Sequence, residues 1–279
     1  MASEAGPHPS RGWLVARVLL LGVAVFLGWG AYDLSVAYRE YRAVEQRLPA
    51  LPQVHAATHR RQVAFPEKVW VHRVNSVERA VLMAKEYRGM EVDATYDSTA
   101  SAFDVGHPPV PSAGISLNRL LAAVPDIRHH YFWIDLKNLT DANAPAACRV
   151  LLATARRYGV VSRMIVESTN PRALGCFTDS GFYTSYYLFP ESGLERMDTE
   201  QLTRYYEEVK ANLAASNVNA LSSSYRSLPF IEAYFPDTDI LLWYLEPGKN
   251  LRRHAALAYL ERKSRVKVVL VKRYSRGYR

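Results

Sequence analysis

The feature that most constrains the fold is a regular alternation along the chain from Lys68 onward. Short runs rich in β-branched and aromatic residues alternate with longer amphipathic runs. Such alternation is typical of a parallel sheet, because a crossover helix must return the chain to the edge where the next strand begins. The strand candidates are KVWVHRV, GMEVDAT, HYFWIDLK, RMIVEST, FYTSYYLF, NALSSSY, DILLWYLE and VKVVLVKR.

Helix start signals lie between these runs. Ser76 precedes VERAVLMAKEY, whose apolar residues share one helical face, and Ser116 precedes LNRLLAAV. Asp198 stands three residues before Gln201, which is close to a capping box. Serine and aspartate favour the N-cap because their side-chain oxygens accept from free backbone N–H groups. These signals predict crossover helices between the strands.

The number of strands favours a closed barrel. Eight strands in about 205 residues fit an α/β fold of the (β/α)8 TIM-barrel type, near the small end of its size range. An open, doubly wound sheet is the alternative. No Gly-x-Gly-x-x-Gly or P-loop sequence follows any of the strands, so the motifs expected of a nucleotide-binding sheet are missing.

The N-terminal segment predicts a different organisation. Residues 13–38 contain the apolar run VLLLGVAVFLGWGAY after Arg11 and Arg17, which favours an uncleaved transmembrane signal anchor with both arginines on the cytoplasmic side. A cleaved signal peptide is the alternative. We therefore predict a cytoplasmic tail (1–12), the anchor (13–38), a stalk (39–66) and an exported barrel (67–279) on a single-pass membrane protein.

The net charge and the cysteine content say little about the function of the chain. The net charge of +8 and a pI near 9.4 weakly favour phosphate-bearing or membrane-surface partners. No basic run with interleaved aromatics predicts nucleic-acid binding. Cys148 and Cys176 form no Cys-x-x-Cys pair, so neither indicates a zinc or redox motif. Whether the two cysteines pair in an oxidising compartment stays open.

Polar residues lie at the ends of the first three predicted strands. His72 ends the first, Glu91 and Asp93 lie near the end of the second, and Asp135 and Lys137 end the third. Barrel active sites form at these ends, and residues two apart on a strand point the same way. Three carboxylates at one barrel mouth would repel unless a cation lies among them. Oxygen ligands favour Mg²⁺ or Ca²⁺.

A second histidine and the lysine complete a reactive set. His107 lies in the loop after the second strand, beside Pro108 and Pro109. Two histidines can divide proton removal and proton donation, and Lys137 can hold a phosphate oxygen. This set suits the cleavage of a phosphodiester. Glu167 ends the fourth strand and either faces the same site or forms a salt bridge at the rim.

These residues also carry a resemblance. HRVNS, MEVDATYD, VGHPP and FWIDLKN resemble the phospholipase-C-like phosphodiesterase superfamily, which includes glycerophosphodiester phosphodiesterases and sphingomyelinase D enzymes, and look closest to the menorin family. The glycerophosphodiesterase pattern has His-Arg-Gly and His-Asp. Here Val74 replaces the glycine and Pro108 replaces the aspartate.

The resemblance implies a role for each matching residue. The roles are acid and base for His72 and His107, Mg²⁺ or Ca²⁺ ligands for Glu91, Asp93 and Asp135, and substrate contacts for Arg73, Asn75, Lys137 and Trp243. The expected protein is a metal-dependent phosphodiesterase, a hydrolase or lyase acting on a glycerophosphodiester or phospholipid-headgroup substrate.

The same residues leave two other functions open. A catalytically degenerate exported barrel would bind a ligand or partner protein without turnover. A glycosidase would use paired carboxylates, but that function leaves both histidines and Lys137 without a role.

Overall fold

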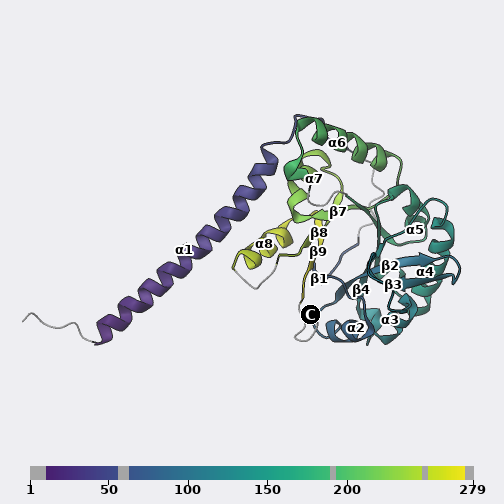
Figure 1. Cartoon of the computed structure of the whole chain (residues 1–279), viewed down its shortest axis with the longest axis horizontal. Helices are drawn as coiled ribbons and strands as arrows, with labels where there is room; N and C mark the ends of the chain where they lie inside the picture. The colour runs from purple at the N-terminus through teal and green to yellow at the C-terminus, as the bar shows by residue number, and fades with distance from the viewer. Residues whose placement is uncertain (1–10, 56–62, 189–192, 247–250, 274–279) are drawn as a thin grey trace, which may run out of the picture.

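The computed structural model describes residues 11–55, 63–188, 193–246 and 251–273. Eight of the described strands are parallel and close into a barrel, because β1 pairs with both β9 and β2 (Figure 1). The barrel strands are β1 (Val69–Val71), β2 (Gly89–Asp97), β4 (Tyr131–Leu136), β5 (Met164–Ser168), β6 (Tyr183–Tyr187), β7 (Ala220–Ser224), β8 (Asp239–Tyr244) and β9 (Val266–Val271). The barrel prediction is confirmed, and the open-sheet alternative is wrong.

One strand was not expected from the sequence. β3 (Ala102–Val105) runs antiparallel to the end of β2, which continues past the barrel to Asp97. The rings of Tyr96 and Phe103, opposite each other in this hairpin, lie 5.3 Å apart. The hairpin leads the chain out and back, so that Gly106 N–H donates to Asp93 C=O at 3.0 Å.

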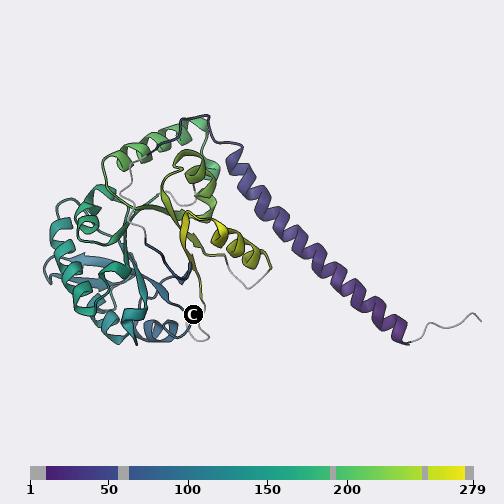
Figure 2. The same ribbon diagram turned by 180° about the vertical axis from the view of Figure 1, so that it is seen from behind.

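Helices surround the strands (Figure 2). They are α2 (Val77–Met83), α3 (Leu117–Ala123), α4 (Ala144–Tyr158), α5 (Gly175–Asp179), α6 (Thr199–Ala214), α7 (Leu228–Tyr234) and α8 (Leu251–Arg262), with 3₁₀ turns η1 (Ile127–His129), η2 (Val161–Arg163), η3 (Pro171–Leu174), η4 (Leu194–Arg196) and η5 (Tyr225–Ser227). The predicted caps Ser76, Ser116 and Asp198 all accept backbone hydrogen bonds, and Asp198 forms a complete capping box with Gln201.

Two helices differ from the sequence prediction. α2 ends at Met83, four residues before the predicted end, and the chain continues in turns to β2. α7 is not predicted by the sequence pattern. Neither difference moves the strand ends that carry polar residues.

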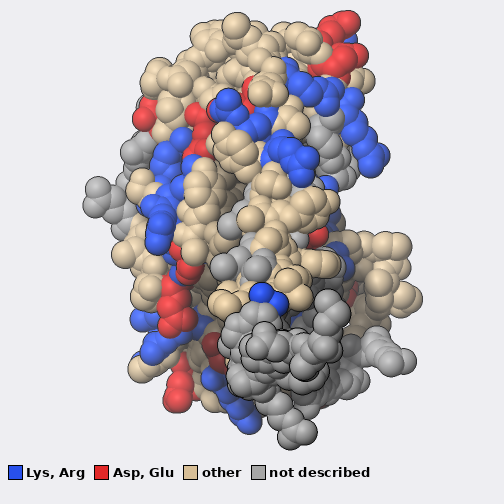
Figure 3. Space-filling model, turned by 90° about the vertical axis from the view of Figure 1, so that its left-hand side faces the viewer, with Lys and Arg blue, Asp and Glu red and all other residues tan. Residues whose placement is uncertain are grey.

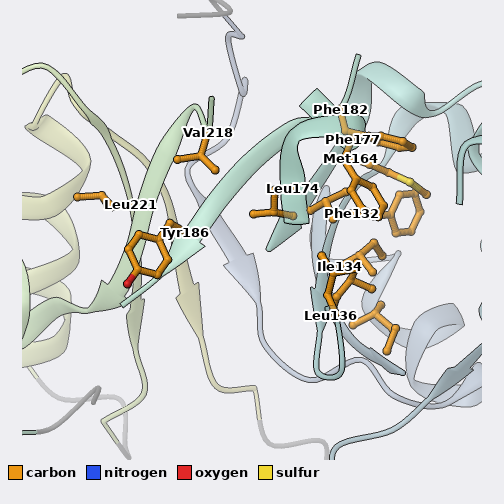
Figure 4. Close-up of a cluster of buried hydrophobic side chains, with 14 of the residues drawn as sticks. Phe132, Ile134, Leu136, Met164, Leu174, Phe177, Phe182, Tyr186, Val218 and Leu221 are labelled. Carbon is orange, nitrogen blue, oxygen red and sulfur yellow. The ribbon is translucent and has the colours of Figure 1, made fainter. Parts of the chain in front are cut away.

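Apolar side chains fill two separate spaces. One lies between the strands and the surrounding helices, where Phe132, Leu174 and Phe177 pack together (Figure 4). The other is the barrel interior, filled by Trp70, Trp133, Ile165, Tyr183, Ala220, Leu241, Trp243, Val268 and Leu270. Phe65 closes this interior with edge-on contacts to the rings of Trp70 and Tyr183 at 5.2 and 5.4 Å.

The segment before the barrel begins with α1 (Arg11–Glu45), which extends away from the barrel (Figure 1). Its last turns contact the barrel, where Val44 is buried and Tyr41 Oη donates to Glu232 Oε2 at 3.0 Å. Residues 49–54 continue along the barrel through hydrogen bonds such as Val54 N to Tyr234 O at 2.7 Å.

In the part of the chain that the structure describes, no helix has the length and apolar character needed to cross a bilayer. The predicted anchor over 13–38 is therefore not confirmed. It falls within α1, many of whose side chains lie outside the described part. Residues 1–10 of the predicted tail and 56–62 of the predicted stalk also lie outside the described residues. The domain boundaries stay predictions.

The surface shows both signs of charge together. On the face drawn in Figure 3, lysine and arginine side chains lie among aspartate and glutamate side chains. The excess of 35 basic over 27 acidic residues is thus not gathered into one basic stripe on this face.

The strand position of Gly89 generates a prediction. A Cβ at Gly89 would lie 2.0 Å from Trp70 Cδ2 inside the barrel, so an alanine there must displace a fully buried ring. We expect Gly89→Ala to lower the free energy of unfolding by about 2–3 kcal/mol. Gly106→Ala is the control, since nothing lies within 4 Å of its Cβ position. Equal urea midpoints for the two variants would contradict this packing.

Candidate active site

The alternation of side chains along each strand positions the polar cluster. On β2, Glu91 and Asp93 follow Gly89 on the inward face, and on β4, Asp135 follows the interior residue Trp133. The parallel register places Asp93 opposite Asp135, and Asp135 opposite Glu167 on β5. The strand pairing itself therefore brings carboxylates from three neighbouring strands together above the apolar interior.

Three of these carboxylates form a compact oxygen cluster. Glu91, Asp93 and Asp135 each offer one oxygen, and these oxygens all lie within 4.8 Å of one another. The three residues are 2 %, 1 % and 8 % exposed. A buried set of carboxylate oxygens at this spacing fits a hard divalent cation, and the residues present therefore suit Mg²⁺ or Ca²⁺.

The electrostatics of the cluster show why it needs positive charge. Burial, reinforced by the charges of Asp93 and Asp135, raises the pKa of Glu91 well above its ordinary value. Burial likewise raises the pKa of Asp135. Burial also acts to raise the pKa of Asp93, but the ion pair with Lys137 and hydrogen bonds from Lys137 and Asn75 outweigh it and lower the value.

Lys137 supplies one positive charge from within the chain. Its Nζ lies 2.8 Å from Asp93 Oδ1 and also donates to Asp135 Oδ2. Although burial opposes the charged form, these two carboxylates raise the pKa of Lys137. The ammonium therefore stays charged beside the oxygen cluster.

Asn75 holds Asp93 from the loop after β1. Its Nδ2 donates to Asp93 Oδ2 at 2.6 Å, and its Oδ1 accepts from Asp93 N–H at 3.0 Å. Asn75 thus fixes both the backbone and the carboxylate of one candidate ligand. It does not line the cavity, so it acts here through Asp93.

The loop after β1 has an unusual backbone at Arg73. Its φ of 57° lies in the left-handed region, which costs an ordinary residue about 1 kcal/mol or more. In this conformation Arg73 N–H donates to Glu91 Oε2 at 2.5 Å. The Arg73 guanidinium lies beside the cluster, with Nε 3.8 Å from Asp93 Oδ2.

Arg79, on α2, holds this loop in place. Its guanidinium donates to the carbonyls of Arg73 at 2.8 Å, His72 at 3.3 Å and Arg273 at 3.0 Å. These carbonyls lie just after β1 and β9, where the barrel closes. One side chain therefore joins the two strand ends and supports the left-handed turn at Arg73.

His72 lies directly above the end of β1. Its Nε2 is 3.8 Å from Glu91 Oε2. Burial, together with the charge of Arg73, lowers the pKa of His72 to about 3. At neutral pH the imidazole is therefore uncharged and can accept a proton.

His107 reaches the site through the β2–β3 hairpin. The hydrogen bond from Gly106 to Asp93 returns the chain to the barrel mouth. His107 Nδ1 lies 2.6 Å from Pro108 O, and because a carbonyl only accepts, Nδ1 carries the hydrogen. Nε2 is then the ring nitrogen left for proton transfer.

These residues surround one cavity of about 130 Å³. Its walls are His72, Arg73, Glu91, Asp93, His107, Asp135, Lys137, Glu167, Tyr187, Trp243, Leu245, Leu270 and Lys272. Every residue predicted for the site except Asn75 lies in this wall. A larger cavity of about 320 Å³ lies elsewhere, between β3, α3 and α4, and no acidic residue or histidine lines it.

Three wall residues are absent from the sequence prediction, Leu245, Leu270 and Lys272, whereas Tyr187 belongs to the tyrosine-rich run FYTSYYLF, for which the sequence leaves open a headgroup pocket or the core. The signal that could have found them is the period of two. Lys272 follows the interior residues Val268 and Leu270 at that spacing, and Tyr187 follows Tyr183. Leu270 lies on the inward face within β9, and extending the inward faces past the ends of β8 and β9 adds Leu245 and Lys272.

Glu167 faces the site, one of the two positions considered from the sequence. It is 2 % exposed, and burial together with the charge of Asp135 raises its pKa well above the ordinary value. Its Oε2 has no hydrogen-bond partner among the described residues. A protonated Glu167 could donate a hydrogen bond into the cavity.

The barrel is similar to solved phosphodiesterases. A provisionally named glycerophosphoryl diester phosphodiesterase from Silicibacter pomeroyi is 15 % identical, with 82 % of this chain and 93 % of that chain covered and a TM-score of 0.50. A glycerophosphodiester phosphodiesterase from Parabacteroides distasonis is 14 % identical over 74 % and 91 % (TM-score 0.47). A calcium-dependent phosphoinositol-specific phospholipase C from a Pseudomonas species is 10 % identical over 76 % and 92 % (TM-score 0.41).

The fold that this chain shares with these structures is the (β/α)8 barrel. The barrel fold that the sequence resemblance implies is confirmed. No protein-family model matches the sequence, and no curated protein matches it. The closer likeness to the menorin family stays a prediction.

The contacts of Arg79 generate a prediction. Arg79→Ala leaves three carbonyls at the barrel closure without their donor, and we expect it to lower the free energy of unfolding by about 1–3 kcal/mol. Arg119 is a matched control. It occupies the same place in α3, with its N–H on the cap Ser116 as Arg79 N–H is on Ser76, but its side chain is exposed. Equal urea midpoints for Arg79→Ala and Arg119→Ala would contradict the assigned role.

Proposed function

We propose that this protein is a metal-dependent phosphodiesterase. The observation that carries the proposal is the cluster of Glu91, Asp93 and Asp135, whose oxygens lie within the reach of one cation in a cavity shared with two histidines. When bound, a Mg²⁺ or Ca²⁺ ion would polarise the phosphoryl group and neutralise charge in the transition state. Glu91, Asp93 and Asp135 would hold it.

The histidines divide the proton transfers. His72 is uncharged at neutral pH and can accept a proton from the attacking hydroxyl or water. His107 in its doubly protonated form, oriented through its Nδ1–H bond to Pro108 O, would donate the Nε2 proton to the leaving oxygen and become the neutral Nδ1–H tautomer. Lys137 and Arg73 stand beside the cluster as cations for the phosphate oxygens. Attack by water gives hydrolysis, and attack by a substrate hydroxyl gives a cyclic product.

The cavity also bears on the substrate. A space of about 130 Å³ is small for a ligand pocket and favours entry of the phosphate and the nearest atoms of its alcohols over entry of acyl chains. Trp243 and Tyr187, whose rings lie 5.1 Å apart, provide an apolar surface beside the polar cluster. A glycerophosphodiester or the headgroup of a phospholipid fits both features.

The two alternative functions, a glycosidase and a barrel that only binds a ligand, account for fewer of the contacts in the cavity. A glycosidase separates its two carboxylates by about 5–9.5 Å to flank a sugar bond, whereas here three carboxylates converge and two of them contact Lys137. A barrel that only binds a ligand requires no second histidine positioned over the cavity. Turnover distinguishes that alternative from the enzyme.

The first test combines turnover with ion binding. Purified protein is mixed with bis-p-nitrophenyl phosphate and a panel of glycerophosphodiesters, with Mg²⁺, Ca²⁺ or EDTA. We expect turnover that EDTA abolishes and that His72→Ala or His107→Ala lowers by at least about a hundredfold. By calorimetry, Asp135→Asn should lose ion binding, while His107→Ala should retain it.

Folding controls separate the outcomes. The circular dichroism spectrum and the urea midpoint are measured for each variant. Those of His107→Ala should match the wild type within experimental error. Folded wild-type protein that binds neither ion and turns over no substrate would reject the enzyme in favour of the binding barrel. Turnover unaffected by EDTA would reject the metal.

We also propose that α1 tethers the barrel to a membrane, with the barrel on the exported side. Support comes from the large apolar side chains that α1 leaves in solvent. Leu19, Leu20 and Leu21 are 64–69 % exposed, and Trp29 is 69 % exposed. Transfer of such residues to lipid is favourable, and Trp29, Tyr32 and Tyr38 would suit an interface.

The tether is tested with the full chain. We expect the protein to pellet with membranes after carbonate extraction, and external protease to reach the barrel in cells with a permeabilised envelope but not in inverted vesicles. Leu20→Arg with Val23→Arg should release it to the supernatant. Wild-type protein in the soluble fraction with its N-terminus intact would reject the tether.

A further inference from the structure

The cavity has two chemically different halves. The strands β2, β4 and β5 supply its carboxylates, and β6, β8 and β9 supply Tyr187, Trp243 and Leu270, with Leu245 just after β8. The barrel order places these two groups of strands on opposite arcs. If the phosphate lies on the carboxylate side, the apolar half is the part of the cavity left for one of the two alcohols that the phosphate esterifies.

One charged residue lies on that apolar half. Lys272 comes directly after β9, two residues beyond the interior residue Leu270, and lines the cavity. It is half-buried, and its positive charge contributes to the lowered pKa of the neighbouring His72. It therefore lies between the apolar wall and the histidine end of the site.

Lys272 differs from the other cations near the site in its partners. Lys137 contacts two carboxylates, and the adjacent Arg273 pairs with Glu86 at 2.6 Å. Within the described ranges, no carboxylate lies within ion-pair distance of the Lys272 ammonium. A partly desolvated cation with no counter-charge attracts an anion and repels a second cation.

We infer that Lys272 is a specificity-determining residue, which selects phosphodiesters whose alcohol part carries an anionic group and disfavours those with a cationic one. The inference rests on the proposed function and names its substrate class. The Trp243 and Tyr187 rings alone would suit a quaternary ammonium group. Lys272, on the same wall, opposes that use of them.

The test uses four glycerophosphodiesters that differ only in the end of the second alcohol: trimethylammonium, methyl, carboxylate or phosphate monoester. With the wild type, we expect kcat/KM to be highest for the anionic pair and lowest for the trimethylammonium ester. The carboxylate and phosphate arms show which anion the site prefers. Lys272→Glu should change the ratio of anionic to cationic kcat/KM by about tenfold or more in favour of the cation.

Two controls isolate the position of the charge. Lys85→Glu makes the same change in net charge at an exposed site after α2, and its substrate ratio should match the wild type. Lys272→Met removes the charge and should bring the kcat/KM values of the anionic and cationic esters closer to one another. High salt should weaken the wild-type preference, since it screens the interaction.

The outcomes are distinguishable. No turnover of any of the four esters by folded wild type would overturn both the proposed function and this inference. Turnover of all four with the same ratios in wild type and Lys272→Glu would overturn the inference alone. A wild-type preference for the trimethylammonium ester would also overturn it.

Discussion

The mutual repulsion of buried carboxylates is the constraint on which the rest of the site depends. Parallel register places Asp93 beside Asp135 and Asp135 beside Glu167, at a depth where little of their surface is open to water. Such a group is stable only with protons or cations among its members. The chain supplies Lys137, and the remaining oxygens are spaced for one divalent ion. The strand register brings the carboxylates together, and their need for charge balance makes the cluster a candidate cation site.

The residues around the carboxylate cluster hold it in place where the barrel closes. β1 has only three residues, so the pairing of β1 with β9 and β2 is short. Arg79 adds three hydrogen bonds at that point. The Arg73 N–H donates to the Glu91 carboxylate, and the Asn75 side chain donates to the Asp93 carboxylate, so the loop after β1 is tied to both. The short pairing at β1 is therefore reinforced by residues that also orient two candidate metal ligands.

Much of this arrangement follows from the sequence, because it depends on two local periods. The eight barrel strands and the inward positions of Glu91, Asp93 and Asp135 follow from alternation, and the caps Ser76 and Ser116 follow from residue type. The β3 hairpin does not, since its pairing with β2 depends on contacts such as Tyr96 with Phe103 that a single sequence does not reveal. Lys272 does not follow from the sequence either, because it lies just past its strand in a segment that is distinguished only by its basic residues.

The two departures from the glycerophosphodiesterase pattern can be explained by the contacts that replace the usual residues. Val74, in place of a glycine, is fully buried in the core, and its N–H donates to Glu91 C=O at 2.8 Å. The left-handed conformation that a glycine would favour occurs one residue earlier, at Arg73, where Arg79 supports it. Pro108 has no carboxylate to orient His107, but its backbone carbonyl accepts from Nδ1 instead. Neither Val74 nor Pro108 lines the cavity, whereas the neighbouring His72, Arg73 and His107 do, so both departures from the pattern leave these three residues in the cavity wall.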